Sequence, residues 1–378
     1  MKVLLNLLAA TAGGQLTRAR AFMDRFDQVM PGAELLVLKE RAVLQEYVSN
    51  SRRKVMDVPI GLGRLKAARR MWWENTAMHG LIRREKPDVY LTFSHYLPAI
   101  PIGIPSVVGV SNLAPFSQEA WAHESWKVRL KMRLLRHTIV DSCHRASCVL
   151  ALSRTCRDVL ISQGVDPHRI VVTPNGVDPS WAAPPKRGVD LSHLGIRHPY
   201  LLYVSHFHRY KNHERLIRAF AALPSEMKQG HQLVLVGKPE NEAYYHELER
   251  LVAELALQDQ VLLWPGADGE TLRALYQRAT LFLFPSLIEN SPNILLEAMM
   301  AGAPVVACNL SPMPEFCETA AVYFDAQNVD NMSAVMSDAL GRPELRQSLS
   351  DKARSQAARY SWDTFAQQMA RHIEMALS

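Results

Sequence analysis

The segment Leu281–Cys308, LFLFPSLIENSPNILLEAMMAGAPVVAC, constrains the fold more than any other part of the chain. Its first four residues are all apolar, which is typical of a buried parallel strand. Ser291 is a good helix N-cap, and Pro292 suits the first helical position. Gly302 predicts a left-handed residue at the helix end, and Pro304 prevents continuation before a second apolar run. The segment therefore predicts a strand–loop–helix–strand unit of a doubly wound sheet.

Two carboxylates flank the predicted start of this helix. Glu289 precedes it, and Glu297 lies about 9 Å along the axis from Ser291, at a rise of roughly 1.5 Å per residue. An anion suits a helix N-terminus, because unpaired N–H groups and the helix dipole favour negative charge. Glu297 could then accept hydrogen bonds from a ribose, while Glu289 would face a group attached beyond the phosphates. The alternative is that both are ordinary surface carboxylates.

The two residues also carry a resemblance to a known family. Glu289-x7-Glu297, within PSLIENSPNILLEAMMAGAPVV, resembles the E-x7-E signature of the retaining GT-B glycosyltransferases of family 4. The resemblance runs in matching order from about Tyr200 to the C-terminus, and more weakly from Met1 to Asp178. It implies an α/β protein of the GT-B fold, in which two Rossmann-like domains face a central cleft.

The resemblance also implies how the chain is divided. Residues 1–180 would form an N-terminal acceptor-binding domain, and residues 188–360 would form a C-terminal domain that binds a nucleotide-sugar. The pattern of apolar residues in 362–378 predicts a final helix, and in this family such a helix packs back on the first domain. With 378 residues, the chain is long enough for two domains of ordinary size.

Donor-binding residues are implied by the same resemblance. Lys211 matches a family lysine that neutralises the donor diphosphate, whereas His206 stands where the family has an arginine. Part of that charge could be absent at neutral pH or supplied by Arg209. The donor contacts implied in this way are Gly14, His206, Arg209, Lys211, Gly237, Lys238, Gly266, Asn290, Ser291, Pro292, Asn293, Ile294, Leu295 and Glu297.

The implied reaction moves a sugar from a UDP- or GDP-sugar to a hydroxyl, with retention of anomeric configuration. Glu289 and Lys211 are the expected catalytic residues, and no dedicated nucleophile is assigned. No Asp-x-Asp motif stands in a suitable place, so we expect no metal site and no cofactor besides the donor substrate. The five cysteines form no Cys-x-x-Cys pair and predict reduced, mostly buried thiols.

Acceptor contacts are expected in the first half of the chain. His95 follows a predicted strand at 87–93, and the carboxyl end of such a strand faces the ligand crevice. A hydrogen-bonded structural histidine is an equal alternative. Ser111 and Asn112 begin a segment, SNLAPF, that resembles the family's His-Asn-x-x-Pro-Phe. Here Ser111 replaces the histidine, which removes the expected histidine contact with the sugar.

Charge is distributed unevenly along the chain. Residues 1–178 contain 25 Lys and Arg against 15 Asp and Glu, whereas the remainder is mildly acidic. The segment Trp121–His137, WAHESWKVRLKMRLLRH, predicts a basic amphipathic helix suited to an anionic membrane surface. The alternative is a helix whose apolar stripe packs on its own domain. No recognised module supports nucleic-acid binding.

These features favour a glycan acceptor, most simply a polyprenyl-linked one, in bacterial surface polysaccharide synthesis. The N-terminus MKVLLNLLAATAGG is interpreted as a first strand and not as a signal peptide, so the expected location is cytoplasmic, at or near the inner face of the plasma membrane. Three alternatives stay open at this point. They are a nucleotide-sugar epimerase of GT-B fold, a glycosyltransferase with a soluble acceptor, and a non-catalytic binding protein.

Overall fold

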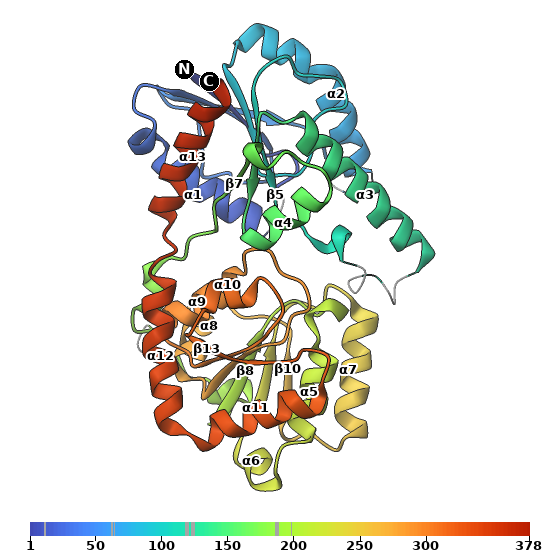
Figure 1. Cartoon of the computed structure of the whole chain (residues 1–378), viewed down its shortest axis with the longest axis vertical. Coiled ribbons are helices and arrows are strands. Elements are labelled where there is room, and N and C mark those ends of the chain that lie inside the picture. Colours follow the sequence, from blue (N-terminus) through green and yellow to red (C-terminus); the bar gives the residue numbers. More distant parts are fainter. Residues whose placement is uncertain are drawn as a thin grey trace. The chain divides into compact units, whose positions relative to one another are not determined.

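The computed structural model describes residues 1–10, 13–61, 63, 65–117, 121, 125–185, 189–197 and 199–378 (Figure 1). Within it the chain forms two compact units. Unit 1 comprises Met1–Phe116, Glu124–Gly176 and Trp362–Ser378, and unit 2 comprises Ser117–His123 and Val177–Ser361. Part of the predicted basic helix, residues 122–124, lies outside the described residues.

The described strands of unit 1 form one parallel sheet in the order β3-β2-β1-β4-β5-β6-β7. Its strands are β1 (Lys2–Asn6), β2 (Glu34–Glu40), β3 (Arg53–Val58), β4 (Val89–Thr92), β5 (Ser106–Val110), β6 (Cys148–Ala151) and β7 (Ile170–Val172). Its α-helices are α1 (Gly14–Val29), α2 (Lys66–Glu85), α3 (Trp126–Arg145), α4 (Arg154–Ser162) and α13 (Trp362–Leu377), and its 3-10 turns are η1 (Ala114–Phe116) and η2 (Pro167–Arg169).

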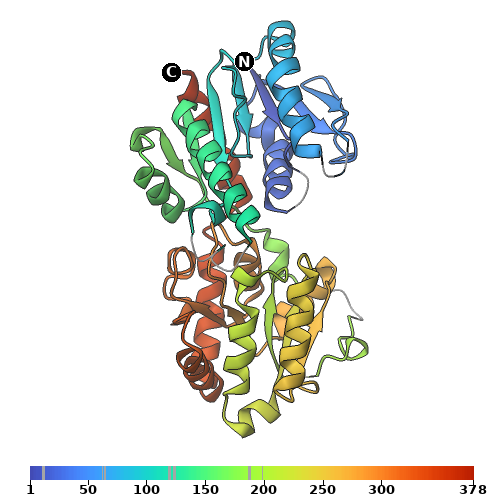
Figure 2. The same cartoon turned by 90° about the vertical axis from the view of Figure 1, so that its right-hand side faces the viewer.

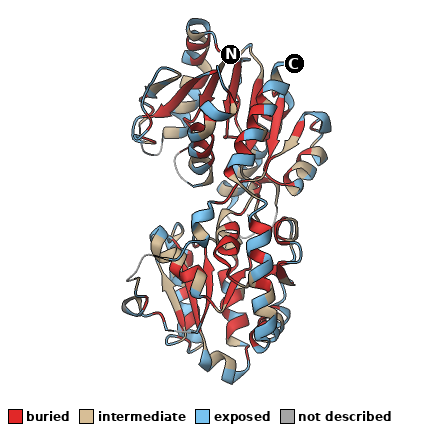
Figure 3. Ribbon diagram, turned by 90° about the vertical axis from the view of Figure 1, so that its left-hand side faces the viewer, coloured by how far each residue is buried: buried red, intermediate tan, exposed pale blue. Residues whose placement is uncertain are grey.

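The C-terminal helix α13 belongs to unit 1, although the whole of unit 2 precedes it in the sequence. Its apolar stripe is buried against α1 and the sheet. Figure 1 shows α13 beside α1, and Figure 3 colours the buried residues of the chain red. Phe365 of α13 lies 6.1 Å from Phe93, ring centre to ring centre, and Phe93 lies 6.3 Å from Phe22 of α1. These ring contacts extend the core of unit 1 across both helices.

The described strands of unit 2 form a second parallel sheet in the order β10-β9-β8-β11-β12-β13, with helices on both faces (Figure 2). Its strands are β8 (Tyr200–Val204), β9 (Gln232–Val236), β10 (Val261–Trp264), β11 (Leu281–Phe284), β12 (Val305–Cys308) and β13 (Ala321–Phe324). Its α-helices are α5 (His213–Ala221), α6 (Ser225–Gly230), α7 (Glu242–Glu254), α8 (Gly269–Arg278), α9 (Asn293–Ala301), α10 (Met313–Cys317), α11 (Val329–Gly341) and α12 (Pro343–Ala357). Its 3-10 turns are η3 (Pro179–Ala182), η4 (Ser192–Leu194) and η5 (Arg209–Lys211).

The strand order of unit 2 determines where a ligand can bind. From β8 the chain adds β9 and β10 on one side, and then β11, β12 and β13 on the other. In open α/β sheets the crevice forms at the carboxyl ends of the strands where this reversal occurs. In unit 2 that point lies between β8 and β11, immediately before the loop that leads into α9.

The central unit predicted from the sequence is confirmed as β11, α9 and β12, and Gly302 ends α9 in the left-handed region at φ 83°. The predicted start of this helix is one residue too early, because the N-cap is Pro292 and not Ser291, and α9 begins at Asn293 and not at Pro292. Proline has no side-chain oxygen, so the N-cap residue itself makes no capping bond to the first N–H groups of α9.

The basic helix also starts later than predicted. It begins at Trp126, after Ser125, whose hydroxyl accepts a hydrogen bond from the Val128 N–H at 3.5 Å. Trp121 therefore lies outside α3, and the helix continues past His137 to Arg145. The five cysteines are buried, which confirms that part of the prediction.

Candidate functional site

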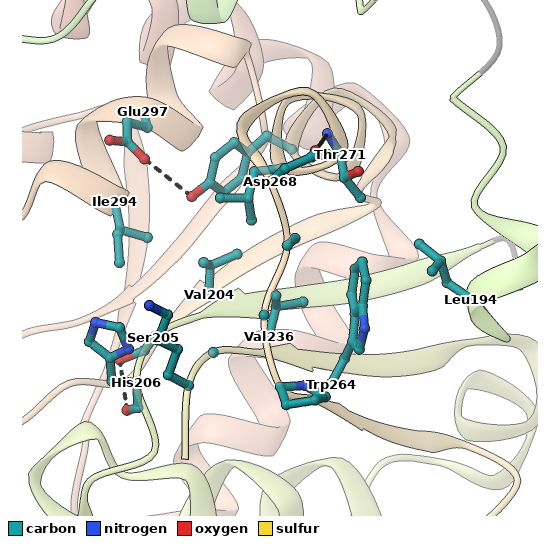
Figure 4. Close-up of a pocket in the computed structure, with 17 residues that line it drawn as sticks. Leu194, Val204, Ser205, His206, Val236, Trp264, Asp268, Thr271, Ile294 and Glu297 are labelled. Atoms are coloured by element: carbon teal, nitrogen blue, oxygen red, sulfur yellow. Dashed lines mark hydrogen bonds between the residues drawn. The ribbon is translucent and has the colours of Figure 1, made fainter. Parts of the chain in front are cut away.

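A pocket of about 510 Å³ lies at the carboxyl ends of β8, β9 and β10 (Figure 4). Residues of α9 form one wall, and Trp264 and Leu194 lie on the opposite side. The described residues that line it are Leu194, Val204, Ser205, His206, Val236, Gly237, Lys238, Trp264, Pro265, Gly266, Ala267, Asp268, Thr271, Leu272, Tyr276, Ile294 and Glu297. Its size and largely apolar lining suit a nucleoside with a few fixed polar contacts.

Glu297 is the acidic group that α9 contributes to this pocket. The Tyr276 hydroxyl lies 3.5 Å from its Oε2 and is oriented to donate to it (Figure 4). Burial raises the pKa of Glu297 to about 7, although the contact with Tyr276 acts in the opposite direction. A carboxylate in such a place gains most from further hydrogen-bond donors, and a ribose diol offers two.

Gly237 permits the close approach of two loops on the floor of the pocket. A Cβ atom at this position would lie 1.8 Å from the carbonyl oxygen and 2.5 Å from the carbonyl carbon of Ser205. The same backbone is held by hydrogen bonds from the Ser205 N–H to the Val236 oxygen and from the Gly237 N–H to the Trp264 oxygen, at 2.8 and 2.9 Å. Only glycine fits at this crossing without movement of the backbone.

We therefore expect Gly237→Ala to lower the free energy of unfolding by about 2–3 kcal/mol, because the added methyl meets backbone atoms and not a flexible side chain. Urea unfolding followed by circular dichroism measures this. Gly269→Ala is the matched control, since a Cβ there meets nothing within 4 Å. Equal stability of the two variants would contradict this packing.

A second polar group lies beside the start of α9. Lys211 Nζ is 2.5 Å from Glu289 Oε1, and the two side chains are only 15% and 13% exposed. The turn that carries Lys211 is fixed by a hydrogen bond from the Tyr203 hydroxyl to the Lys211 oxygen, at 3.1 Å. A second bond runs from the Leu287 N–H to the Tyr210 oxygen, at 2.8 Å. A cation and a carboxylate are thus held together next to the helix N-terminus, where an anion could take the place of Glu289.

Family models match both halves of the chain. Residues 194–356 match the family model described as "Glycosyl transferases group 1", and residues 35–181 match the model "Glycosyltransferase Family 4". The chain belongs to the group 1 glycosyl transferases. The resemblance predicted from the sequence is thereby confirmed, and so is the GT-B fold class with its two Rossmann-like domains.

Individual curated relatives match only parts of the chain. The serotype-specific mannosyltransferase WbdA of Escherichia coli is 34% identical over 153 residues, which are 40% of this chain and 19% of WbdA. The O-antigen chain mannosyltransferase B of E. coli is 27% identical over 243 residues, which are 62% of each protein. The chain thus spans less than two thirds of the length of either relative.

The fold is shared with solved structures. The structure of Anabaena HepE in complex with UDP and glucose superposes with a TM-score of 0.75 and 18% identity, covering 99% of both chains. At this identity the likeness establishes the fold alone.

Six of the residues predicted to bind the donor line the pocket around Glu297. They are His206, Gly237, Lys238, Gly266, Ile294 and Glu297. Partial burial lowers the pKa of His206, which favours the neutral form of its ring at pH 7.

Other residues of unit 2 that were predicted to bind the donor do not line the pocket around Glu297. Arg209 turns to Glu247, with its Nη2 at 2.6 Å from Oε2, and its guanidinium lies 5.0 Å from the centre of the Tyr244 ring. It lines no part of the pocket around Glu297. Leu295 is fully buried in the core of unit 2, and Asn290 is buried in the loop before α9.

Two of the acceptor-contact residues predicted in unit 1 make hydrogen bonds within their own domain. The Ser111 hydroxyl donates to the Phe93 oxygen at 2.8 Å and accepts from Arg18 Nη2 at 2.9 Å. Asn112 Oδ1 accepts from the Ala114 N–H at 2.9 Å, at the start of η1. These bonds fix the loop after β5.

The other two site residues predicted in unit 1 are Gly14 and His95. Gly14 is the first residue of α1 and follows Gly13, whose φ of 65° places it in the left-handed region. Burial lowers the pKa of His95 to about 4, and within the described part of the chain its Nδ1 is buried without a hydrogen-bond partner. His95 is therefore neutral at physiological pH.

Tyr276 and Trp181 were missed by the sequence reasoning. Tyr276 bonds Glu297 through its hydroxyl, and its ring packs edge-on against Trp181 at 5.6 Å between ring centres. Trp181 also lies beneath the Arg273 guanidinium, at 5.9 Å. In the sequence, Tyr276 falls at a position of α8 that any core aromatic could occupy, so nothing there signals a contact with the site. Trp181 lies three residues after the sequence Pro-Asn-Gly-Val-Asp at 174–178. This turn is the one local feature of the sequence that draws attention to Trp181.

No group of three or more His, Cys, Asp or Glu side chains among the described residues has the arrangement of a metal site. Metal independence stays a prediction from the sequence. The pocket and the Lys211–Glu289 pair together offer an apolar recess, a carboxylate, a cation and a helix N-terminus. This set of groups can hold a nucleoside diphosphate.

Proposed function

We propose that this glycosyltransferase transfers a hexosyl group from a UDP- or GDP-sugar to a hydroxyl of a glycan acceptor in polysaccharide synthesis, with retention of anomeric configuration. The observation that carries the proposal is the pairing, in unit 2, of the pocket around Glu297 with the ion pair of Lys211 and Glu289. Both related enzymes cited above are named mannosyltransferases, which favours mannose as the transferred sugar.

In this proposal the base and ribose occupy the 510 Å³ pocket, and Glu297 accepts from the ribose hydroxyls. The loop residues Gly237 and Gly266 let backbone groups approach the base. The diphosphate lies against the N-terminus of α9, where the first N–H groups point toward it. An arriving phosphate replaces Glu289 as the partner of Lys211, which frees Glu289 to position the sugar.

The chemistry then depends on the departing diphosphate. Transfer builds negative charge on that group, and Lys211 together with the helix N-terminus stabilises it in the transition state. We assign no dedicated nucleophile, and the leaving phosphate itself assists deprotonation of the acceptor hydroxyl. Glu289 is the carboxylate we place near the anomeric carbon.

A thermal-shift screen tests donor binding directly. The protein is heated with UDP, GDP, ADP or CMP, and then with the matching sugar nucleotides. A nucleotide at a hundred times its Kd is expected to add about 2.7 kcal/mol to the free energy of unfolding. Incubation of the stabilising sugar nucleotide without acceptor separates a transferase from an epimerase, since only an epimerase converts the donor alone. Absence of stabilisation by every nucleotide would contradict the proposal.

The acceptor proposal concerns α3 of unit 1 (Figure 1). Trp126, Leu130 and Leu134 are 68%, 48% and 61% exposed, and their spacing of four residues places them on one face of the helix. Lys127 and Lys131 follow the first two of them directly. An exposed apolar stripe flanked by lysines suits the interface of an anionic bilayer. We therefore propose a lipid-linked acceptor and peripheral binding to the membrane that carries it.

None of the described helices is both long enough and apolar enough to cross a membrane. Binding through α3 can be measured by sedimentation with vesicles containing anionic phospholipid. We expect the double variant Trp126→Ser, Leu134→Ser to lower the vesicle-bound fraction at least fivefold at low salt, because it removes the two most exposed residues of the stripe.

The matched control is Met375→Ser, which removes a residue of α13 that is 54% exposed. It is expected to bind vesicles as the unmodified protein does. If the unmodified protein ignores anionic vesicles even at low salt, the membrane proposal is wrong.

A further inference from the structure

Unit 2 contains a second cavity, of about 410 Å³, which shares no lining residue with the pocket around Glu297. It lies among η5, α5, α7, the loop after β11 and the start of α11. Helices α5, α7 and α11 pack beside one another on one face of the sheet, whereas α8 and α9, which border the first pocket, pack together elsewhere (Figure 1). The residues of this cavity that matter here are Arg209, Tyr210, Arg215, Arg218, Tyr244 and Leu287.

The cavity carries an excess of positive charge. Three arginines line it, against one lining carboxylate, Glu214. Arg218 is paired with Glu214 at 3.1 Å, and Arg209 is paired with Glu247 at 2.6 Å. Arg215 takes part in none of the ion pairs found among the described residues. Its Nη1 donates to the neutral Oδ1 of Asn212, at 3.0 Å.

The partner of Arg215 is itself held rigidly. Asn212 Nδ2 donates to the Pro285 oxygen at 3.2 Å and to the Ala326 oxygen at 2.8 Å, and Asn212 has a φ of 64°. Asn212 precedes α5, and Val329 begins α11, so two helix N-termini lie at this cavity. Their dipoles add to the positive potential of the arginines. Arg215 is thus fixed in a position from which it can bind an anion at little cost in entropy.

We propose that this cavity binds a phosphomonoester, as a second anionic ligand distinct from the sugar nucleotide. Arginine matches the geometry of phosphate oxygens. Tyr210 lines the same cavity and is partly exposed, so it offers an apolar ring surface and a hydroxyl to a group attached to the phosphate. The volume is sufficient for a sugar phosphate. The same chemistry could come from free inorganic phosphate.

The ligand would be coupled to the donor site through η5. Tyr210 lines the cavity, and the next residue, Lys211, binds Glu289. Leu287 also lines the cavity, and its N–H donates to the Tyr210 oxygen, which ties together the two loops that hold this ion pair. A phosphomonoester bound in this cavity is expected to change the affinity of the protein for the nucleotide about fivefold or more. The bound nucleotide must then change the affinity for the phosphomonoester by the same factor. This coupling rests on the proposed function, whereas binding of the phosphomonoester does not.

Isothermal titration tests the proposal, with inorganic phosphate and glucose 6-phosphate as probes and glucose as the uncharged counterpart. The full chain is compared with Arg215→Gln and with the control Arg250→Gln, which removes the same charge from an exposed position on α7. We expect saturable binding of at least one phosphorylated probe to the unmodified protein and to Arg250→Gln, and at least tenfold weaker binding to Arg215→Gln. The tighter probe identifies the source of the phosphate.

Arg218→Gln is a second variant in case Arg215→Gln does not fold, and it is expected to weaken binding in the same direction. Three results would overturn the proposal. They are no binding of either phosphorylated probe, unchanged affinity in a folded arginine variant, and competition between the probe and a saturating nucleotide for one site. Nucleotide binding is measured separately. Failure of the phosphate probes to bind therefore leaves the proposed donor site intact, and failure of the nucleotides to bind leaves the proposed phosphomonoester site intact.

Discussion

Glu297→Gln is expected to lower kcat/KM for the sugar nucleotide on the order of a hundredfold. In the unmodified protein both ribose hydroxyls donate to the charged carboxylate. In the variant only the neutral amide oxygen can accept a hydrogen bond, because the amide NH₂ group is a donor. Hydrogen bonds to a charged group contribute about 1.5–3 kcal/mol, against about 1 kcal/mol for neutral ones, so the loss amounts to about 2–3 kcal/mol. Steady-state kinetics with the donor identified by thermal shift measures it.

The same substitution is expected to stabilise the protein when no ligand is bound. Burial raises the pKa of Glu297 from 4.5 to about 7, so the folded state holds a proton that the unfolded chain releases between these values. Stability therefore falls as pH rises through this window. At pH 8, Glu297→Gln should be more stable by up to about 3 kcal/mol. At pH 4 the carboxyl is mostly protonated in both states, and the advantage should nearly vanish.

Nucleotide binding should show the opposite dependence on pH. Because the ribose donates to the ionised carboxylate, binding favours that form and releases a proton near pH 7. Affinity for the sugar nucleotide, whose diphosphate has no proton that titrates in this range, is expected to rise from pH 6 to pH 8 in the unmodified protein and to stay flat in Glu297→Gln. Glu344→Gln, at an exposed position on α12, serves as the control and should change neither quantity. If Glu297→Gln binds nucleotide with full affinity and an unchanged pH profile, Glu297 does not hold the ribose.

Lys211→Met is expected to reduce kcat by a factor of about 10² to 10³, because one preorganised cation is removed from the departing diphosphate. It should also destabilise the unliganded protein by about 3 kcal/mol, since Glu289, only 13% exposed, is left without its partner. Single-turnover kinetics and urea unfolding measure the two effects. Lys352→Met, on the exposed side of α12, is the matched control and should be close to neutral in both.

The double variant Lys211→Met, Glu289→Gln separates the two effects. With no charge left in the pair, stability should recover most of what the single variant loses, whereas activity should stay at or below its level. A Lys211→Met enzyme with nearly full kcat would show that the diphosphate is neutralised by another group, and the mechanism proposed above would then be wrong.

The sequence predicts most of the elements that build the donor pocket. Apolar runs such as Leu281–Phe284 and residues 233–236 are buried on both faces of a parallel sheet and so appear as continuous hydrophobic stretches. Edge strand β3, Arg53–Val58, was missed because its exposed residues and mixed composition remove that signal. The start of α9 was misplaced by one residue, a usual uncertainty at helix ends.

Side-chain partners were harder to predict than elements. Lys211 and Glu289 were each identified, but nothing in the sequence indicates that the two residues, 78 positions apart, form an ion pair. Arg209 stands two residues from Lys211, yet the η5 turn directs its side chain to Glu247 and the second cavity. A pattern of residue types locates a loop near a ligand. The direction of each side chain depends on the turn geometry and on partners distant in sequence.

A crystal structure with the nucleotide selected by thermal shift tests the central claim most directly. We predict that both ribose hydroxyls lie at about 2.7 Å from the Glu297 carboxylate oxygens, a normal distance for such bonds. We also predict that a phosphate oxygen replaces Glu289 beside Lys211 at the start of α9. A nucleotide bound outside this pocket, or inside it with its ribose turned away from Glu297, would contradict the account.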